Sequence, residues 1–412
     1  MKKIPTYLRG GALLLAIVLA TVIAMGTAGL LLLLQYHRQY AANNMRQERL
    51  QQNLASATNL LLTGYHTTPT DTLALNLFDG DRDSVILACQ PWGVFDWATA
   101  WAYEGADTLQ RTFLMGKVPT PNERFALYLA DEHLPLSVSG KTFIRGDVFL
   151  PEAGTRKSYI ENEAFAYEEV IHEGTIYNSA DMLPAVDTTV IDWLNNYLQS
   201  DGNRVDSLTI DLFFPGEDTI VVANQVITVT ANAKLNNALL FAPHIRFEPG
   251  FHGRLQAFAR DSLVVGSDCR FDYPSALGVI HIPTDSLFTE FQPYLRVDSA
   301  SVFNGIVFTY FPGSEQLLAK LVLAKEATVH GQVYADGLLE LQGRVNGTTL
   351  CRRFTLQTAS SLYDNFILGG VMDMTTRSPH YAGSPLLNRG RLGRIALSID
   401  NHNPKSTGYE DQ

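Results

Sequence analysis

An unbroken apolar run lies at the start of the chain. Residues 11–34 contain no charged side chain, and a helix of that length covers roughly 36 Å, enough to cross the ~30 Å hydrocarbon core of a bilayer. The run is longer than the apolar region of a cleaved signal peptide. Its small-residue cleavage site, at 26–28, is followed by Gly29 and five leucines. No second run of this length follows, so we predict one retained transmembrane helix.

The hydrophobic pattern then becomes amphipathic while helix propensity stays high. Residues 35–63 hold neither Pro nor Gly, and Gly64 supplies a stop. One apolar stripe runs along this segment, formed by Leu50, Leu54, Ala57 and Leu61. The pattern predicts a single continuous helix whose second half, an amphipathic stalk, lies on a folded domain.

Beyond residue 64 the hydrophobic period changes to two, which is typical of strands. We predict a mainly β chain that begins with a β-meander over 64–130. Asp79-Gly80 is a hairpin turn signal within it. The surrounding DGDRD is similar to a calcium loop in its spacing of carboxylates, but it lacks the Gly and Glu that an EF-hand needs at its sixth and twelfth positions.

The stretch VFDWATAWAYE places four aromatic side chains on one face of a strand by alternation. They are Phe95, Trp97, Trp101 and Tyr103, and alanines occupy the other face. Because large aromatic side chains usually bury, we expect this row to pack against the stalk helix. If the row is exposed instead, Trp97 and Trp101 are the candidate residues for contacting a glycan or a protein partner.

A longer repeat marks the second half of the chain. Phe241 begins FAPHIRFEPG and Phe258 begins FARDSLVVG, while TVHG at Thr328 is followed by RVNG at Arg344. Spacings of 16 or 17 residues are typical of solenoid coils that stack their apolar positions. We predict a short-coil, right-handed β-helix over 204–375, with an antiparallel β-sandwich as the alternative.

The remaining segments are less regular. Residues 131–203 are predicted as a mixed β region that contains a short helix at 188–200, ended by Gly202. The segment 376–412 is rich in Pro, Gly and polar residues, and we expect it to be loop with a disordered end.

The distribution of charge along the chain predicts how the apolar run is oriented in a membrane, and it argues against a nucleic-acid partner. The chain has a net charge of −11, and without the three basic residues that precede the apolar run it has 28 basic residues against 42 acidic ones. We expect no nucleic-acid partner, because such a partner needs clustered positive charge. Basic residues before the run are Lys2, Lys3 and Arg9, and those soon after it are Arg38, Arg46 and Arg49. We expect residues 1–10 to be a cytoplasmic leader of an inner-membrane protein whose bulk lies in the periplasm or outside.

No reaction motif emerges from the sequence. Three widely spaced cysteines, Cys89, Cys269 and Cys351, give neither a disulfide framework nor a zinc motif. Glu169 and His172 have the spacing of a carboxylate and an imidazole on one helix face, but their segment follows a β region and is interpreted as a polar loop. We therefore predict no catalytic residue, no metal and no cofactor. A membrane-tethered carbohydrate-active enzyme, a polysaccharide lyase or hydrolase built on a β-helix, is the alternative.

The first 63 residues resemble the N-terminal helix of type IV pilins and type II secretion pseudopilins. A short basic leader, a glycine, an apolar first half and an amphipathic second half carry the resemblance. In that family a peptidase cuts after the glycine, so the resemblance implies Gly10 or Gly11 as the processing site. The family's usual glutamate at the fifth mature position is replaced by Leu15 or Ala16, as in minor pseudopilins that lack it.

The run TVHGQVYADGLLELQGRVNGTTL resembles the right-handed β-helix coils of bactofilin-type polymer-forming proteins. From these patterns together we predict a non-catalytic, single-pass envelope protein that presents a rigid β-helical surface for structural, assembly or adhesive interactions. Its predicted partners are the bilayer, through 11–34, and envelope proteins or further copies of itself. A glycan that contacts the two tryptophans is a further candidate.

Overall fold

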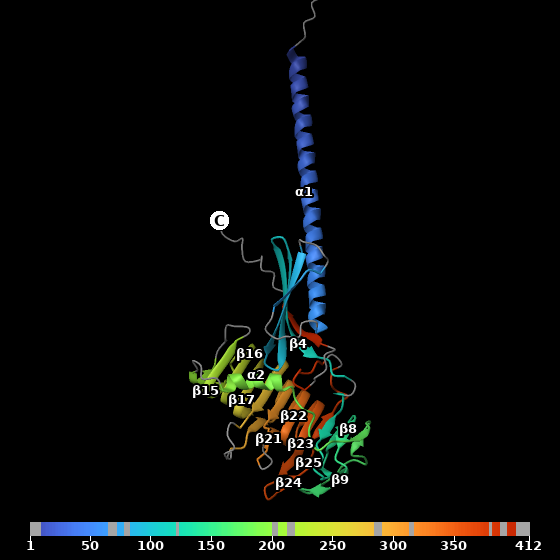
Figure 1. Ribbon diagram of the computed structural model, residues 1–412, viewed down its shortest axis with the longest axis vertical. Helices are drawn as coiled ribbons and strands as arrows, with labels where there is room; N and C mark the ends of the chain where they lie inside the picture. The colour runs from blue at the N-terminus through green and yellow to red at the C-terminus, as the bar shows by residue number, and fades with distance from the viewer. Residues whose placement is uncertain are drawn as a thin grey trace, which may run out of the picture.

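The computed structural model describes residues 10–64, 72–77, 83–120, 123–199, 205–211, 219–283, 291–312, 317–378, 381–387 and 394–400. The long helix α1 (Gly10–Leu62) projects away from a β-rich body and contacts it only with its C-terminal part (Figure 1). One continuous helix therefore covers both the apolar and the amphipathic segments, as their uninterrupted helix propensity predicts.

An antiparallel five-stranded sheet lies beside the end of α1. Its order is β1 (Thr72–Leu75), β2 (Asp83–Trp92), β3 (Phe95–Glu104), β4 (Asp107–Lys117) and β27 (Arg394–Asp400). Tight turns at Gly93 and Gly105, both with positive φ, connect β2 to β3 and β3 to β4. Residues 79–82 of the DGDRD segment lie outside the described residues, as do the leader before Gly10 and the predicted helix end at Gly202.

Strand β27 corrects the expectation that 376–412 is loop. Residues 394–400 pair antiparallel with β4, with Ile399 opposite Phe113, and Leu386 upstream of them is completely buried. The prediction was wrong here because a single edge strand gains its stability from the sheet that it joins, and its own sequence is too short to show a clear period. The predicted disordered end, 401–412, lies outside the described residues.

Most of the body is a stack of parallel strands, which we call the parallel stack. The part of the stack that begins at β14 contains, in chain order, β14 (Val205–Ile210), β15 (Ile220–Val229), β16 (Asn236–Phe247), β17 (His252–Val265), β18 (Arg270–Ile280), β19 (Tyr294–Val297), β20 (Val302–Tyr310), β21 (Ala319–Leu323), β22 (Thr328–Leu341), β23 (Arg344–Gln357) and β26 (Val371–Asp373). The opposite end is built by strands that come earlier in the chain, which are β5 (Leu127–Leu129), β7 (Phe143–Arg145), β8 (Val148–Leu150), β12 (Ile171–His172) and β13 (Ile176–Asn178).

The spacing of the sequence repeats corresponds to the register in which neighbouring parallel strands of this stack pair. Phe241 pairs with Phe258, and Thr328 pairs with Arg344, both between parallel strands. The same registers place other apolar residues of these strands, such as Leu240 and Ala257, above one another in a continuous buried interior. Because these pairs are parallel, the antiparallel sandwich is wrong for this region.

The chain enters the stack at two places. Strands β5 to β13 build one end of it, and α2 (Thr188–Gln199) then lies across the outside of β16 and β17 on the way to the other end (Figure 1). From β14 the chain runs back until β23 pairs with β5, with Cys351 opposite Leu129. Strands from the first and last parts of the stack in chain order are therefore neighbours in space.

Short strands complete the body at the end built by β5 to β13. A parallel three-stranded sheet contains β25 (Phe366–Leu368), β6 (Leu136–Ser139) and β9 (Thr155–Lys157), and β24 (Leu362–Asp364) pairs antiparallel with β23. An antiparallel pair, β10 (Tyr159–Ile160) and β11 (Glu163–Ala164), extends this end. The molecule is thus mainly β with one long apolar helix.

Candidate functional site: the long helix and its attachment

The first half of α1 is an uncovered apolar surface. Within the described residues α1 is long and apolar enough to cross a membrane, and none of its most apolar window is buried (Figure 1). The hydroxyls of Thr21 and Thr27 donate to the carbonyls of Val18 and Ala24, at 2.8 and 2.9 Å. Because these hydroxyls are satisfied inside the helix, neither of them would face a lipid phase as an unpaired donor.

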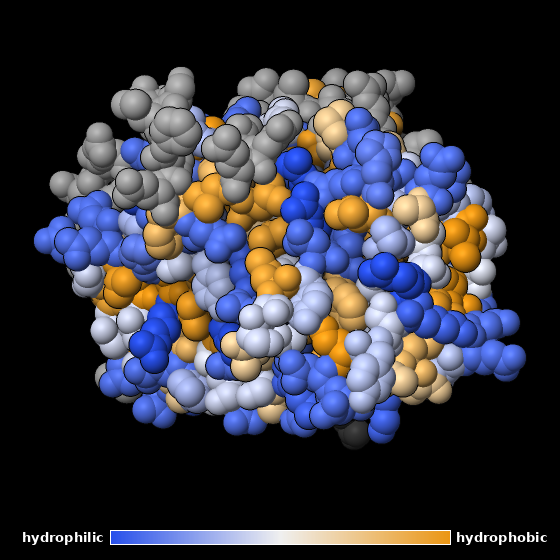
Figure 2. All heavy atoms as spheres, turned by 90° about the horizontal axis from the view of Figure 1, so that it is seen from below, coloured by the Kyte–Doolittle hydropathy of each residue, from blue (hydrophilic) through white to orange (hydrophobic). Residues whose placement is uncertain are grey.

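The body that α1 carries has a different surface. Hydrophilic and hydrophobic residues are intermixed over the face of the molecule that lies away from α1 (Figure 2). This face of the body (Figure 2) therefore differs from the uncovered first half of α1, which is apolar throughout.

The second half of α1 is packed on the antiparallel sheet. The four residues of the predicted stripe are at most 5 % exposed, and they share one core cluster with the alanines of β3, which are Ala98, Ala100 and Ala102. Small side chains on the strand let the helix approach the sheet closely. The predicted apolar stripe, Leu50 to Leu61, is therefore the contact surface of the stalk.

Ion pairs tie the helix to the turn between β3 and β4. Arg46 lies 3.0 Å from a carboxylate oxygen of Asp107, and Arg49 pairs with Glu104, whose carboxylate is nearly buried. A charge in that position needs a partner, because an unpaired buried carboxylate is costly. These arginines thus fix where along the sheet α1 lies.

The aromatic row on β3 faces away from α1, which corrects the sequence-based expectation. Alternation puts the alanines on the helix side, so Phe95 and Trp97 belong instead to the core cluster shared with α2. Trp97 lies 5.6 Å from Trp92, between ring centroids. Trp101 is half-buried, opposite Gln110 of β4. The expectation failed because alternation defines two faces but does not say which of them the helix covers.

Hydrogen bonds at the tip of the β2–β3 hairpin join the antiparallel sheet to the parallel stack, and we call this contact the hairpin lock. The side-chain amide of Gln256 on β17 accepts from the backbone N–H of Val94 at 2.8 Å and donates to the carbonyl of Trp92 at 2.9 Å. The hydroxyl of Ser384 donates to the carbonyl of Val94 at 2.6 Å. Gly93 (φ 64°) is required between them, because a Cβ there would lie 2.0 Å from Gln256 Oε1.

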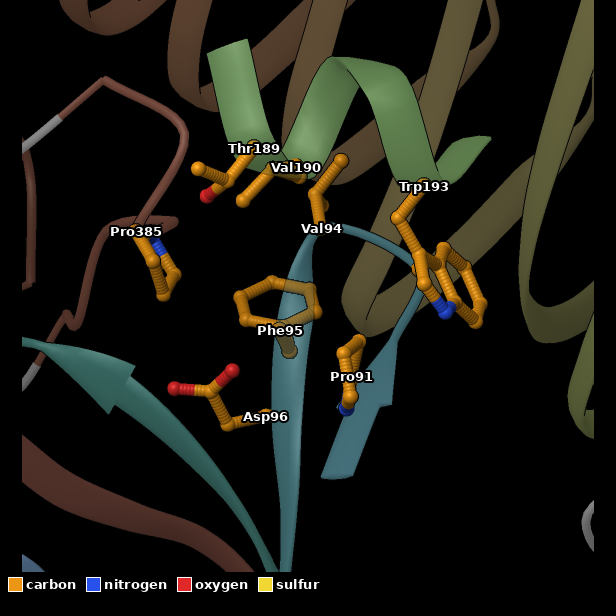
Figure 3. Close-up of a pocket in the computed structure, with 9 residues that line it drawn as sticks. Pro91, Val94, Phe95, Asp96, Thr189, Val190, Trp193 and Pro385 are labelled. Carbon is orange, nitrogen blue, oxygen red and sulfur yellow. The ribbon is translucent and has the colours of Figure 1, made fainter. Parts of the chain in front are cut away.

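A small cavity of about 290 Å³ lies beside this lock. The hairpin tip, the first turn of α2 and Pro385 line it, with Phe95, Val190 and Trp193 supplying apolar walls (Figure 3). The cavity therefore borders the contact that joins the antiparallel sheet to the parallel stack.

Asp96 is the carboxylate in the wall of this cavity. Burial raises the pKa of Asp96, and Arg394 of β27, 3.8 Å away, opposes that rise. The Thr189 hydroxyl, also in the lining, donates at 2.7 Å to Asp187, which caps α2 by accepting from the Thr189 N–H at 3.0 Å. That hydroxyl therefore serves the helix cap.

The other sequence-predicted residues are dispersed. Gly10 begins α1, and Gly11 lies in its first turn, where a Cβ would meet no atom of another described segment within 4 Å. Glu169 is exposed, whereas the ring of His172 stacks on Phe143 at 4.5 Å. No group of three His, Cys, Asp or Glu side chains able to hold a metal occurs among the described residues.

A polar groove of about 590 Å³ lies at the end of the stack built by β5 to β13. Its charged lining consists of Lys141, Glu161, Glu163 and Lys325. Sequence reasoning missed these residues because they come from separate segments and form no local motif.

Comparisons with known proteins place a pilin among the similar structures. No protein-family model and no curated protein matches the chain. Among solved structures the chain is similar to the competence-associated pilin ComZ from Thermus thermophilus, with 10 % sequence identity and a TM-score of 0.23 over 88 % of this chain and 96 % of that chain. The class that the structure itself defines is a mainly β protein with a long N-terminal apolar helix.

Proposed function

We propose that this chain is a non-catalytic, single-pass envelope protein that holds a rigid β domain close to the membrane surface, in the manner of a pilin-like component. The observation that carries the proposal is the division of α1: its apolar half is uncovered, while its amphipathic half is packed and ion-paired on the sheet. Motion of the membrane segment is thereby coupled directly to the body.

Rigidity of the body supports a scaffold or assembly role. The hairpin lock at Gln256 joins the antiparallel sheet to the parallel stack, and α2 packs into the core cluster that the two share. We infer that the parallel stack is a β-helix, because successive coils pair in register around one apolar interior. Parallel crossovers are right-handed in nearly all proteins, which supports the right-handed form.

The membrane part of the proposal is tested by topology. We expect the native protein to fractionate with the inner membrane and to be degraded from the outside when protease reaches the periplasmic face of spheroplasts. Replacing Leu31 and Leu32 by arginine puts two charges into the apolar segment and should release the protein into the soluble fraction. A wild-type protein that is soluble after cell lysis would contradict the membrane proposal.

The pilin-like part is tested by the mature N-terminus. Sequencing the protein from its native cell should give a start at Gly11 or Ala12 if the leader is processed as in that family. An intact Met1 would refute processing, and a start near Gly29 would show that the apolar segment is a signal peptide. Gly10→Val and Gly11→Val provide the matched variants that identify which glycine is read.

The carbohydrate-active alternative has one specific place in the structure. Glu161 and Glu163 line the polar groove together with Lys141 and Lys325, and paired carboxylates are what glycoside hydrolysis uses. Release of reducing sugar from envelope polysaccharide by the purified chain, abolished in Glu161→Gln or Glu163→Gln, would replace the non-catalytic proposal. We expect no such release.

A further inference from the structure

The apolar interior of the parallel stack ends in an uncovered side chain. An inner column of residues runs in register from Leu240 on β16 through Thr349 on β23 and Leu127 on β5 to Val148 on β8 and Ile176 on β13. The first four of these residues are completely buried, whereas Ile176 is 57 % exposed. The column therefore stops at a position that its own pattern assigns to the interior.

A second column on the outer side of the same strands ends in the same way. Leu350 pairs with Tyr128, Tyr128 with Phe149 and Phe149 with Tyr177. The rings of Tyr128 and Phe149 stack at 5.3 Å, and those of Phe149 and Tyr177 stack at 5.1 Å. Tyr177 is 45 % exposed, so part of this side chain is left uncovered at the end of the column.

The backbone of β13 has an open edge. Within the described part of the chain, β13 pairs only with β8, where the carbonyl of Thr175 accepts from Val148 and the N–H of Ser179 donates to Leu150. In a parallel pair, every second residue of a strand hydrogen-bonds to the same neighbour. Ile176 and Asn178 alternate with the residues that bond to β8, so their N–H and C=O groups point out of the stack. Such an edge is a template for another strand.

The charge around this edge selects the partner. Residues 127–181, which build this end, contain ten acidic side chains and four basic ones. Arg145 is paired with Glu173, whereas Glu168 and Glu169 are exposed. Strand β14 at the opposite end carries Asp206, with Asp211 directly after it. A second copy stacked end to end would bring like charges together, whereas a basic segment would meet opposite charge.

We propose that β13 binds an extended, basic segment of a partner protein as an added β-strand. Main-chain hydrogen bonds to Ile176 and Asn178 hold the segment, an apolar side chain covers Ile176, and an aromatic one stacks on Tyr177. Lysine or arginine residues on either side face the acidic rim. The inference deepens the proposed function, on which it rests for the partner's location in the envelope.

The test uses a peptide of that chemistry and the purified full-length chain in detergent. Fluorescein-labelled KTVYVTK should bind saturably by anisotropy, and Asn178→Pro should weaken binding about tenfold or more, because proline removes the outward N–H while the bonds to β8 remain. Leu362→Ser, at a residue of β24 that is 61 % exposed, is the matched control and should bind as wild type does. Unchanged circular dichroism verifies that both variants fold.

A second peptide tests the charge selection. ETVYVTE, with the same apolar centre, should bind several-fold more weakly than KTVYVTK at low salt. Absence of saturable binding of KTVYVTK to the wild type, equal binding to Asn178→Pro, or equal binding of both peptides would overturn the proposal. Wild-type dimerisation in sedimentation that Asn178→Pro abolishes would also overturn it, since the occupant would then be a second copy. All of these measurements use the purified chain, so none of their outcomes depends on whether the protein spans a membrane in the cell.

Discussion

At the residue scale, charges at the surface of the parallel stack are held in specific pairs. Asp261 on β17 lies 2.9 Å from Arg260 and 3.2 Å from the ring of His281. Burial acts to raise the pKa of Asp261, but hydrogen bonds from His281 and Arg260 outweigh it and lower that pKa to about 2. The ionised carboxylate is therefore more favourable in the folded chain than in the unfolded one.

This lowered pKa predicts a pH dependence of stability. Asp261 contributes stability above the ordinary aspartate pKa of 3.8 and loses it as the pH falls through about 2. Asp261→Asn should therefore lower the free energy of unfolding at neutral pH, and the difference from wild type should shrink between pH ~4 and ~2. Urea denaturation in detergent across that range measures it, with exposed Asp181→Asn as control. A difference that stays constant with pH would refute the role of the charge.

At the scale of elements, a local sequence pattern defines the faces of a helix or strand, but the neighbouring element decides which face it covers. The apolar stripe of α1 and the alternation on β3 are both present in the structure, yet they meet through alanines and not through the aromatic row. Close packing of helix on sheet is what small side chains permit, and the larger rings fill the wider space beside α2. The hydrogen bonds of Gln256 then join the sheet, on which α1 packs, to the parallel stack.

The helix–sheet contact can be tested with a matched pair of substitutions. Ala57 is completely buried against the alanine face, while Ala55 on the same helix is exposed. Ala57→Leu should destabilise the folded chain by about 1–3 kcal/mol through overpacking, and Ala55→Leu should change stability little. Urea unfolding followed by tryptophan fluorescence measures both. Equal stability of the two variants would show that α1 is only loosely held.

At the scale of the whole molecule, strands from distant parts of the sequence pair with each other in the parallel stack. Glu132 next to β5 accepts from both Arg352 and Arg353 of β23, and Arg352 follows Glu132 by 220 residues. Contacts between residues so far apart in sequence carry a large loop-closure entropy, so folding is expected to be slow for a chain of this size.

Disruption at this closure should affect the entire stack. Leu129 is completely buried and faces Cys351 across the closure, so Leu129→Ala should cost about 2–5 kcal/mol. Hydrogen exchange should rise together in peptides covering β5 and β23, which checks that the two form one cooperative unit. Leu134→Ala, at a residue that is 41 % exposed, is the control. Faster exchange confined to β5 would contradict the closure.

Local periodicity determined the elements of this protein. The uncharged run at 11–34, the stripe from Leu50 to Leu61 and the 16- and 17-residue offsets each depend on residues close in sequence. The helix, the strands and the register between neighbouring parallel strands followed from them. The same information could not show which face of β3 meets α1, that 394–400 joins the sheet, or that Gln256 holds a hairpin far away in the chain. It also left Ile176 and Tyr177 unmarked as the uncovered end of the stack. Only the tertiary structure decided these features, because pairing between distant segments depends on the shape and free hydrogen-bonding groups of the partner and leaves no periodic signal in either sequence.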